Sequence, residues 1–107
     1  MVTPPFTLIW SPKSVLDLDR LHDWITETSP TAANAYLIGL TSKAASLLRH
    51  PRRGHPLHES DLPPDNNPFR EIHYRNHRII YTIHEREISI ITVIHQRRHF
   101  ALWMMDP

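Results

Sequence analysis

The sequence predicts an α+β fold: an N-terminal strand, an antiparallel helical hairpin, then a three-stranded antiparallel meander. Two segments with apolar residues at helical spacing each begin at a Ser-Pro pair. A later stretch, residues 69–99, is rich in Ile and Thr and is interrupted at short intervals by polar residues. The chain has 107 residues and no cysteine, which predicts a single domain, 1–107, whose core needs no disulfides.

The predicted fold begins with a strand over residues 6–10, a short β-branched and aromatic run that is expected to join the later sheet. A helix over 12–27 follows, with Ser11 as its N-cap and Pro12 as its first residue. Its apolar stripe is formed by Val15, Leu18, Leu21, His22 and Ile25, and Leu16 and Trp24 widen it.

The second helix is predicted over residues 30–49, again with a Ser cap (Ser29) followed by Pro30. The short connection between the helices predicts an antiparallel hairpin. Small residues on the second helix would let it approach a neighbour closely. Its apolar stripe consists of Ala33, Tyr36, Leu37, Leu40, Ala44, Leu47 and Leu48.

Residues 50–68 form a Pro- and His-rich stretch without helical or strand periodicity, which predicts a long loop of a kind that is often functional. Five of its side chains are potential metal ligands, but their spacing matches no common metal site, so none is predicted. These residues are His50, His55, His58, Glu59 and Asp61.

Three strands are predicted at the C-terminal end, over residues 69–75, 78–84 and 88–96. The last is almost entirely apolar, which is typical of a strand covered on both faces. Strict alternation would place Ser89, Ile91, Val93 and His95 on one of those faces. The apolar tail, 100–107, is expected either to pack back on the sheet or to dock on a partner.

Basic residues recur along these strands, and Arg outnumbers Lys ten to two in the chain. Arg favours planar recognition of carboxylate or phosphate groups. Three interpretations remain open: cross-strand ion pairs with Glu71, Glu85 and Glu87, contact with an acidic protein partner, or metal-free RNA cleavage with a His as proton carrier. The set comprises Arg70, Arg75, Arg78, Tyr81, His95, Arg97 and Arg98.

Several classes of function are not indicated by the sequence. It contains no phosphate-binding loop, nucleophile elbow, paired zinc histidines or dinucleotide fingerprint, and only two glycines, so no cofactor is expected. No apolar run is long enough to span a membrane. Together with the absence of cysteine, this favours a cytoplasmic location.

The order of these segments resembles the RelE/ParE superfamily of type II toxin–antitoxin toxins, with the ParE branch favoured. The family's first strand end and first helix are similar to WSPKSVLDLDRLHDWI, and its second helix and following corner to SPTAANAYLIGLTSKAASLLRHPRRG. Its three closing strands are similar to FREIHY, HRIIYTI and ISIITVIHQRRH. The chain lacks the C-terminal Tyr that RelE-like nucleases often use, and its 50–68 loop is longer than the family connection.

The resemblance implies a toxin that inhibits DNA gyrase by binding, is neutralised by a cognate antitoxin, and forms a hetero-oligomer with it. Two alternatives are a RelE-like, metal-independent endoribonuclease that cuts mRNA on the ribosome, and an inactive relative that only binds its antitoxin. An open, apolar second sheet face would suit an antitoxin that wraps around the toxin.

The candidate residues differ between these alternatives. A nuclease would use Arg70, Arg78, His95 and Arg97. A binding toxin would contact its partners through Arg70, Arg78, Tyr81, His95, Arg97, Arg98, Phe100, Leu102 and Trp103.

Overall fold

The computed structural model describes residues 5–59, 62 and 67–105. Predictions for the remainder of the loop, Asp61 included, and for residues 106–107 of the tail lie outside the described residues. In chain order the elements are β1 (Thr7–Trp10), α1 (Pro12–Thr26), α2 (Pro30–Ala45), the 3-10 turn η1 (Ser46–Leu48), β2 (His55–Pro56), β3 (Phe69–Tyr74), β4 (His77–His84), β5 (Glu87–His95) and the 3-10 turn η2 (Leu102–Met105).

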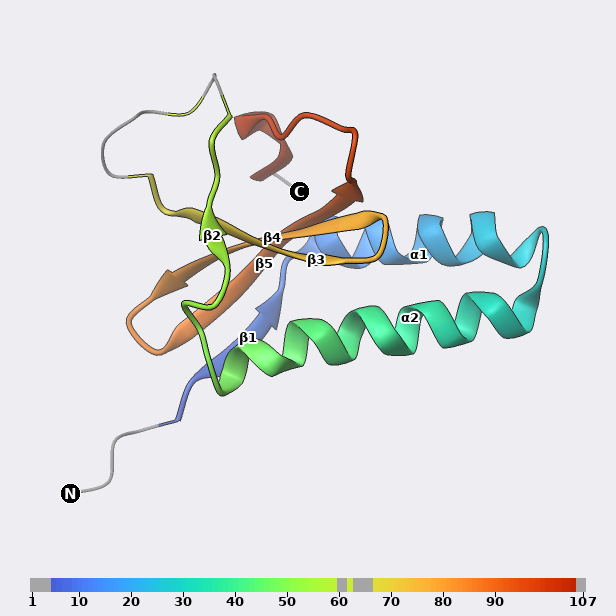
Figure 1. The fold of residues 1–107 in the computed structure, drawn as a ribbon, viewed down its shortest axis with the longest axis horizontal. Helices are drawn as coiled ribbons and strands as arrows, with labels where there is room; N and C mark the ends of the chain where they lie inside the picture. The colour runs from blue at the N-terminus through green and yellow to red at the C-terminus, as the bar shows by residue number, and fades with distance from the viewer. Residues whose placement is uncertain (1–4, 60–61, 63–66, 106–107) are drawn as a thin grey trace.

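The strands form one five-stranded sheet in the order β1-β5-β4-β3-β2. β3, β4 and β5 form the antiparallel meander, and α1 and α2 form a helical hairpin against one face of the sheet (Figure 1). The predicted α+β fold class is therefore confirmed. β1 pairs with β5 in parallel, which is possible because the helical hairpin and the meander separate the two strands along the chain.

Both helices begin at the predicted caps. The Ser11 hydroxyl accepts a hydrogen bond from the backbone N–H of Ser14 at 3.0 Å and donates one to the Ile91 carbonyl at 2.8 Å. This cap therefore also ties the start of α1 to β5. Ser29 accepts from the Ala32 N–H at 3.2 Å. The α-helical part of the second helix ends at Ala45, earlier than predicted, and η1 tightens the final turn.

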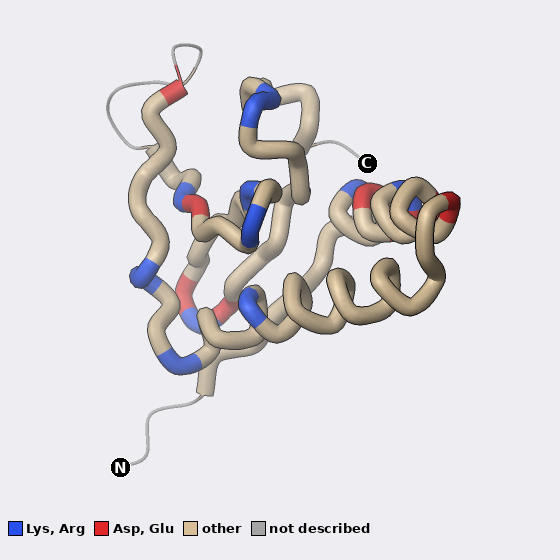
Figure 2. Tube along the Cα trace, turned by 45° about the vertical axis from the view of Figure 1, so that its right-hand side comes forward, with Lys and Arg blue, Asp and Glu red and all other residues tan. Residues whose placement is uncertain are grey.

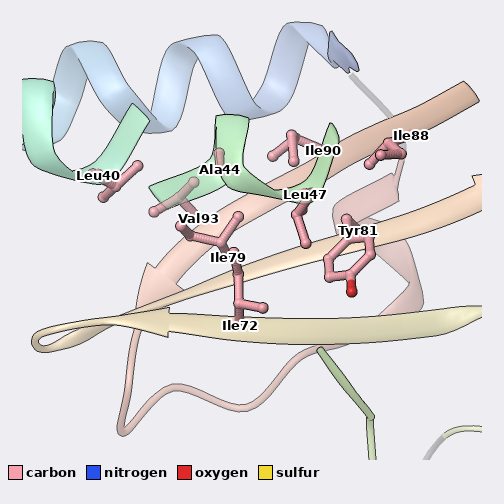
Figure 3. Packing of buried hydrophobic residues seen from close by; sticks show 9 residues of the cluster. All are labelled: Leu40, Ala44, Leu47, Ile72, Ile79, Tyr81, Ile88, Ile90 and Val93. Atoms are coloured by element: carbon pink, nitrogen blue, oxygen red, sulfur yellow. The ribbon is translucent and has the colours of Figure 1, made fainter. Parts of the chain in front are cut away.

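The main core lies between the helical hairpin and the sheet (Figure 3). Its helical side comes from α2 and η1, with Leu18 and Leu21 of α1 packed against it. The small Ala44 side chain sits among larger ones, as expected where a helix approaches a sheet closely. The buried members are Leu40, Ala44, Leu47, Ile72, Ile79, Tyr81, Ile88, Ile90 and Val93.

The second face of the sheet is covered by the chain's own loop and tail. Phe100 and Met104 are 0% and 2% exposed, and the Phe69 and Phe100 ring centroids lie 4.9 Å apart. The expectation of an open apolar second face is therefore wrong, because this second cluster fills it. Its members are Leu57, Leu62, Phe69, Ile80, Ile91, Ile94, Phe100 and Met104. Leu102, Trp103 and Met105 remain exposed on the outer side of the tail.

A bulge in the β4–β5 pair corrects the predicted faces of β5. Ile80 pairs with Thr92 whereas Tyr81 pairs with Ile90, so Ile91 is an extra residue on β5. Val93 belongs to the core under the helices, whereas Ile91 packs on the opposite face. Strict alternation fails because one inserted residue reverses the faces of every residue after it.

The apolar stripe predicted for α1 is partly wrong. Val15, Leu16 and Trp24 are 46%, 44% and 69% exposed. The connected end of the helical hairpin extends beyond the strands of the sheet (Figure 1). Trp24 belongs to the last turn of α1, at that end. On α2, Ile38 is 66% exposed, and Lys43 is its only charged residue, which leaves the helix largely uncharged (Figure 2).

The predicted loop contains a short edge strand, β2, in which His55 and Pro56 pair with Glu71 and Arg70. Tyr81 anchors residues 51–54, the corner of the chain that precedes β2. The buried Tyr81 hydroxyl accepts from the Gly54 N–H at 3.0 Å and donates to the Pro51 carbonyl at 2.7 Å. A side chain at position 54 would lie 2.5 Å from that hydroxyl, so only Gly fits this close approach.

The Tyr81→Phe substitution is expected to lower the free energy of unfolding by about 1–3 kcal/mol, because it removes the hydroxyl partner of the buried Gly54 N–H and of the half-buried Pro51 carbonyl. Tyr36→Phe is the matched control. Its half-buried hydroxyl bonds His77 at 2.7 Å, and losing that bond should cost about 0.5–1.5 kcal/mol. Urea unfolding of both variants measures the difference. Equal costs for the two variants would contradict the anchoring role of Tyr81.

Candidate functional site

Arg78 lies in a buried ion-pair cluster on the second face of the sheet. Its Nη2 contacts Glu71 Oε2 at 2.6 Å and also pairs with Glu59 from the loop. Its Nη1 donates to the Arg98 carbonyl at 2.6 Å. Arg78 is only 7% exposed, so its side chain is fully engaged in holding the loop and the residues after β5 to the sheet.

Charges within this cluster stabilise each other. Burial alone would raise the pKa of Glu71, but hydrogen bonds and attraction from Arg78 and His73 hold it below its ordinary value. Burial alone would lower the pKa of Arg78, whereas its bonds to Glu71 and Glu59 raise it. Both groups are therefore charged at neutral pH, and the interpretation of Arg78 as an ion-pair partner of Glu71 agrees with the geometry.

Arg70 is also engaged by the chain itself. Its Nε donates to the Gly54 carbonyl at 3.0 Å, and its Nη2 donates to the Arg52 carbonyl at 3.1 Å. These bonds fasten the corner after η1 to β3. Two of the four nuclease candidates, Arg70 and Arg78, therefore hold the loop in place.

His95 and Arg98 line a cleft of 260 Å³ between α1, the end of β5 and the tail, which we call the His95 cleft. Cationic side chains predominate over acidic ones around it, and Trp103 contributes an exposed aromatic ring. Its lining residues are Lys13, Asp17, Arg20, Leu21, His77, Val93, Ile94, His95, Arg98 and Trp103.

Two imidazoles lie side by side in the His95 cleft, with the ring centroids of His77 and His95 5.6 Å apart. Burial, with a further contribution from His95, lowers the pKa of His77, so His77 is neutral at neutral pH. Burial raises the pKa of the Tyr36 hydroxyl that bonds His77. His95 Nδ1 accepts the Arg97 N–H at 3.2 Å, which leaves Nε2 of the exposed His95 ring for a ligand.

Asp17 joins α1 to β5 at the floor of the cleft. Its carboxylate accepts the Val93 N–H at 3.0 Å and bonds the Thr92 hydroxyl, and Lys13 contacts it at 2.8 Å. Lys13 also lies 5.9 Å from the centre of the Trp103 ring. Lys13 and Arg20 were missed by the sequence analysis because they lie on the helix, far along the chain from the strand residues they face.

A second basic surface lies just after the C-terminal end of α2 and η1, around a cavity of 560 Å³. Its lining residues are Phe6, Arg49, His50, Pro51, Arg52 and Arg53, and we call it the arginine pocket. The Arg86 guanidinium lies 4.8 Å from the centre of the Phe6 ring. The run of arginines was visible in the sequence, but its meeting with Phe6 required the parallel pairing of β1 with β5.

The structure thus divides the predicted contact residues into three groups. His95, Arg98 and Trp103 line the cleft, and Arg97 and Leu102 are exposed near it. Arg70 and Arg78 hold the loop. Tyr81 and Phe100 are 0% exposed, so neither offers a surface to a partner in this conformation.

Comparison with known protein families identifies the chain. The family described as the ParE toxin of the type II toxin–antitoxin system parDE matches residues 8–100, from β1 to the start of the tail. The chain belongs to the ParE toxin family. The favoured ParE branch is therefore confirmed at the level of the family.

Solved structures of similar fold support the same architecture for this ParE-family chain. One, titled as the chromosomal ParDE toxin–antitoxin system from P. aeruginosa, has a TM-score of 0.68 and 17% identity, and the match covers 84% of this chain and 95% of that one. Another, the toxin–antitoxin complex RelBE2 from Mycobacterium tuberculosis, has a TM-score of 0.59 and 22% identity, and covers 86% and 99%. At these identities the likeness concerns the fold.

The comparison with curated protein sequences gives no match for this ParE-family toxin. Among its described residues, neither helix has the length and apolarity needed to cross a membrane.

Proposed function

We propose that this ParE-family toxin inhibits DNA gyrase by binding to it, without catalysis of its own. The engagement of Arg70 and Arg78 supports the proposal, because RNA cleavage would need their guanidinium groups free to hold a phosphate. A toxin that acts by binding does not need these two guanidinium groups to be free. His95, Arg97, Arg98, Leu102 and Trp103 offer exposed cationic and apolar groups on one side of the molecule, a combination suited to a protein surface.

We further propose that a cognate antitoxin neutralises the toxin in a hetero-oligomer. Trp103, Trp24 and Ile38 are large apolar side chains that are each more than half exposed. An amphipathic antitoxin segment would cover such residues. Arg97 and Arg98 would then meet its acidic side chains. The proposed complex would act in the cytoplasm, where gyrase and its DNA lie.

The test is a supercoiling assay with relaxed plasmid DNA, gyrase and the purified full-length toxin. We expect supercoiling to stop and cleaved DNA to accumulate, and we expect addition of the antitoxin before the toxin to prevent both effects. An Arg97→Ala/Arg98→Ala double variant should need a higher concentration for the same inhibition. Gyrase that remains fully active at high toxin excess would overturn the proposed target.

A further inference from the structure

We propose that the edge of the sheet at β2 and β3 carries a binding site for a divalent transition-metal ion such as Zn²⁺. Three side chains converge there: His55 from β2, and Glu71 and His73 from β3. One possible ligand atom from each lies within 4.8 Å of the other two. In the sequence His55 stands among the other potential ligands of the loop, and only the β2–β3 pairing brings it beside Glu71 and His73.

The backbone builds this convergence. His55 pairs directly with Glu71 across the two strands, and His73 follows two residues after Glu71 and therefore lies on the same face of the sheet. The ring centroids of His55 and His73 are 5.7 Å apart. Two hydrogen-bonded neighbouring strands therefore supply all three ligands.

The ligand atoms already point at a common centre. His55 Nε2 lies 3.5 Å from Glu71 Oε1, and His73 Nε2 is hydrogen-bonded to the same oxygen. A small outward rotation of the two exposed rings would leave space for an ion between them. In the metal-free chain His73 Nε2 donates its proton to Glu71 Oε1. Ion binding would displace that proton, and each ring would then carry its proton on Nδ1 and offer the Nε2 lone pair to the ion.

A hydrogen bond from Arg78 orients the Glu71 carboxylate for metal binding. Arg78 binds its Oε2 at 2.6 Å, so only Oε1 faces the two imidazoles. Such a hydrogen bond to the far oxygen fixes the orientation of a metal-binding carboxylate.

The donor set indicates which ion would bind. Two imidazole nitrogens and one carboxylate oxygen are typical ligands of Zn²⁺, and the remaining position would be open to water because both histidines are exposed. Mg²⁺ prefers oxygen ligands and should not bind. Lys43 and Arg53 line the same cleft, and their charges reduce the affinity for any cation.

An occupied site would fix the corner that follows the helices. β2 is a two-residue edge strand, and the ion would join it to β3 through side chains in addition to its backbone bonds. The arginine pocket lies on the same corner, at residues 49–53. Metal binding would therefore stiffen one of the two basic surfaces of the toxin.

The test measures thermal unfolding of the untagged full-length chain at pH 7.5 with Zn²⁺ or Mg²⁺. With free Zn²⁺ 100-fold above its dissociation constant, we expect the melting temperature to rise by roughly 10 °C. Mg²⁺ should leave it unchanged. Calorimetric titration should show one Zn²⁺ per chain, and Co²⁺ in its place should give the visible absorption bands of a site with nitrogen ligands.

Three variants identify the ligands. His55→Gln and His73→Gln should each weaken Zn²⁺ binding at least about tenfold, and neither should destabilise the metal-free chain strongly, because both side chains are exposed. His58→Gln is the matched control, since His58 is an exposed histidine of the same loop outside the site. No Zn²⁺-induced shift, or an equal loss in the His58→Gln control, would overturn the proposal.

Discussion

Arg78→Ala is expected to lower the free energy of unfolding by about 3–5 kcal/mol, the cost of leaving buried charges without their partner. The substitution would take the guanidinium partner away from the Glu71 and Glu59 carboxylates, which are both largely shielded from water and would keep only their histidine contacts. It would also remove the bond to the Arg98 carbonyl. The loop and the chain after β5 would lose a common anchor. Urea unfolding followed by circular dichroism measures the loss.

Arg97→Ala is the matched control for Arg78, because Arg97 is exposed near the end of the same sheet. Its substitution should change stability by less than about 0.5 kcal/mol. A loss below about 1 kcal/mol for Arg78→Ala would mean that the ion-pair cluster does not hold the loop. Arg78 would then be available for another role, including contact with RNA.

Phe100→Ala is expected to cost about 3–5 kcal/mol, because it removes a fully buried aromatic ring and leaves a cavity beside Phe69. The tail would also lose its main attachment to the second face of the sheet. Chemical unfolding measures the loss of stability.

Leu102→Ala is the control for Phe100, since Leu102 lies in the same tail and is 47% exposed. It should cost much less, within about 1 kcal/mol. If Phe100→Ala were equally mild, the tail would not pack on the sheet in solution. The second face would then be open, as the sequence alone suggested.

The fold class could be predicted from the sequence because local signals agreed with the global pattern. Ser11 and Ser29 cap the helices. Strand alternation places Ile79 and Tyr81 on the face under the helices and Ile80 on the other face, as expected. The two hairpin turns of the meander are indicated in the sequence only by the polar residues that interrupt its strands, at Asn76 and at 85–87. Their positive-φ residues are Arg75 and Glu85, types that rarely mark such turns, so no stronger signal existed.

The candidate site was harder to predict, because it depends on contacts that the sequence does not encode locally. The bulge at Ile91 reverses the faces of Val93 and His95, and brings His95 to the side where α1 supplies Lys13 and Arg20. Arg70 and Arg78 carried the right charge for a binding site. Their bonds to Gly54, Glu59 and Glu71 depend on the path of the loop, which has no periodic pattern.

The burial of Tyr81 and Phe100 illustrates the same limit. Tyr81 was grouped with the basic residues of the strands, and Phe100 belongs to the apolar tail that was expected either to pack back on the sheet or to dock on a partner. The Tyr81 hydroxyl instead accepts a hydrogen bond from the Gly54 N–H, and Phe100 packs in the cluster on the second face of the sheet. Aromatic residues serve cores and interfaces equally well, and only the folded chain distinguishes the two uses.

The His95→Ala variant tests most directly whether this toxin acts by binding and not by catalysis. Gyrase supercoiling and the dissociation constant for gyrase would be measured for the wild-type chain and for this variant. We predict that wild-type toxin stops supercoiling, and that the variant loses inhibition only in proportion to its lost affinity. The claim would be contradicted if wild-type toxin left gyrase active and cut mRNA on ribosomes, with His95→Ala abolishing cleavage while ribosome binding persisted.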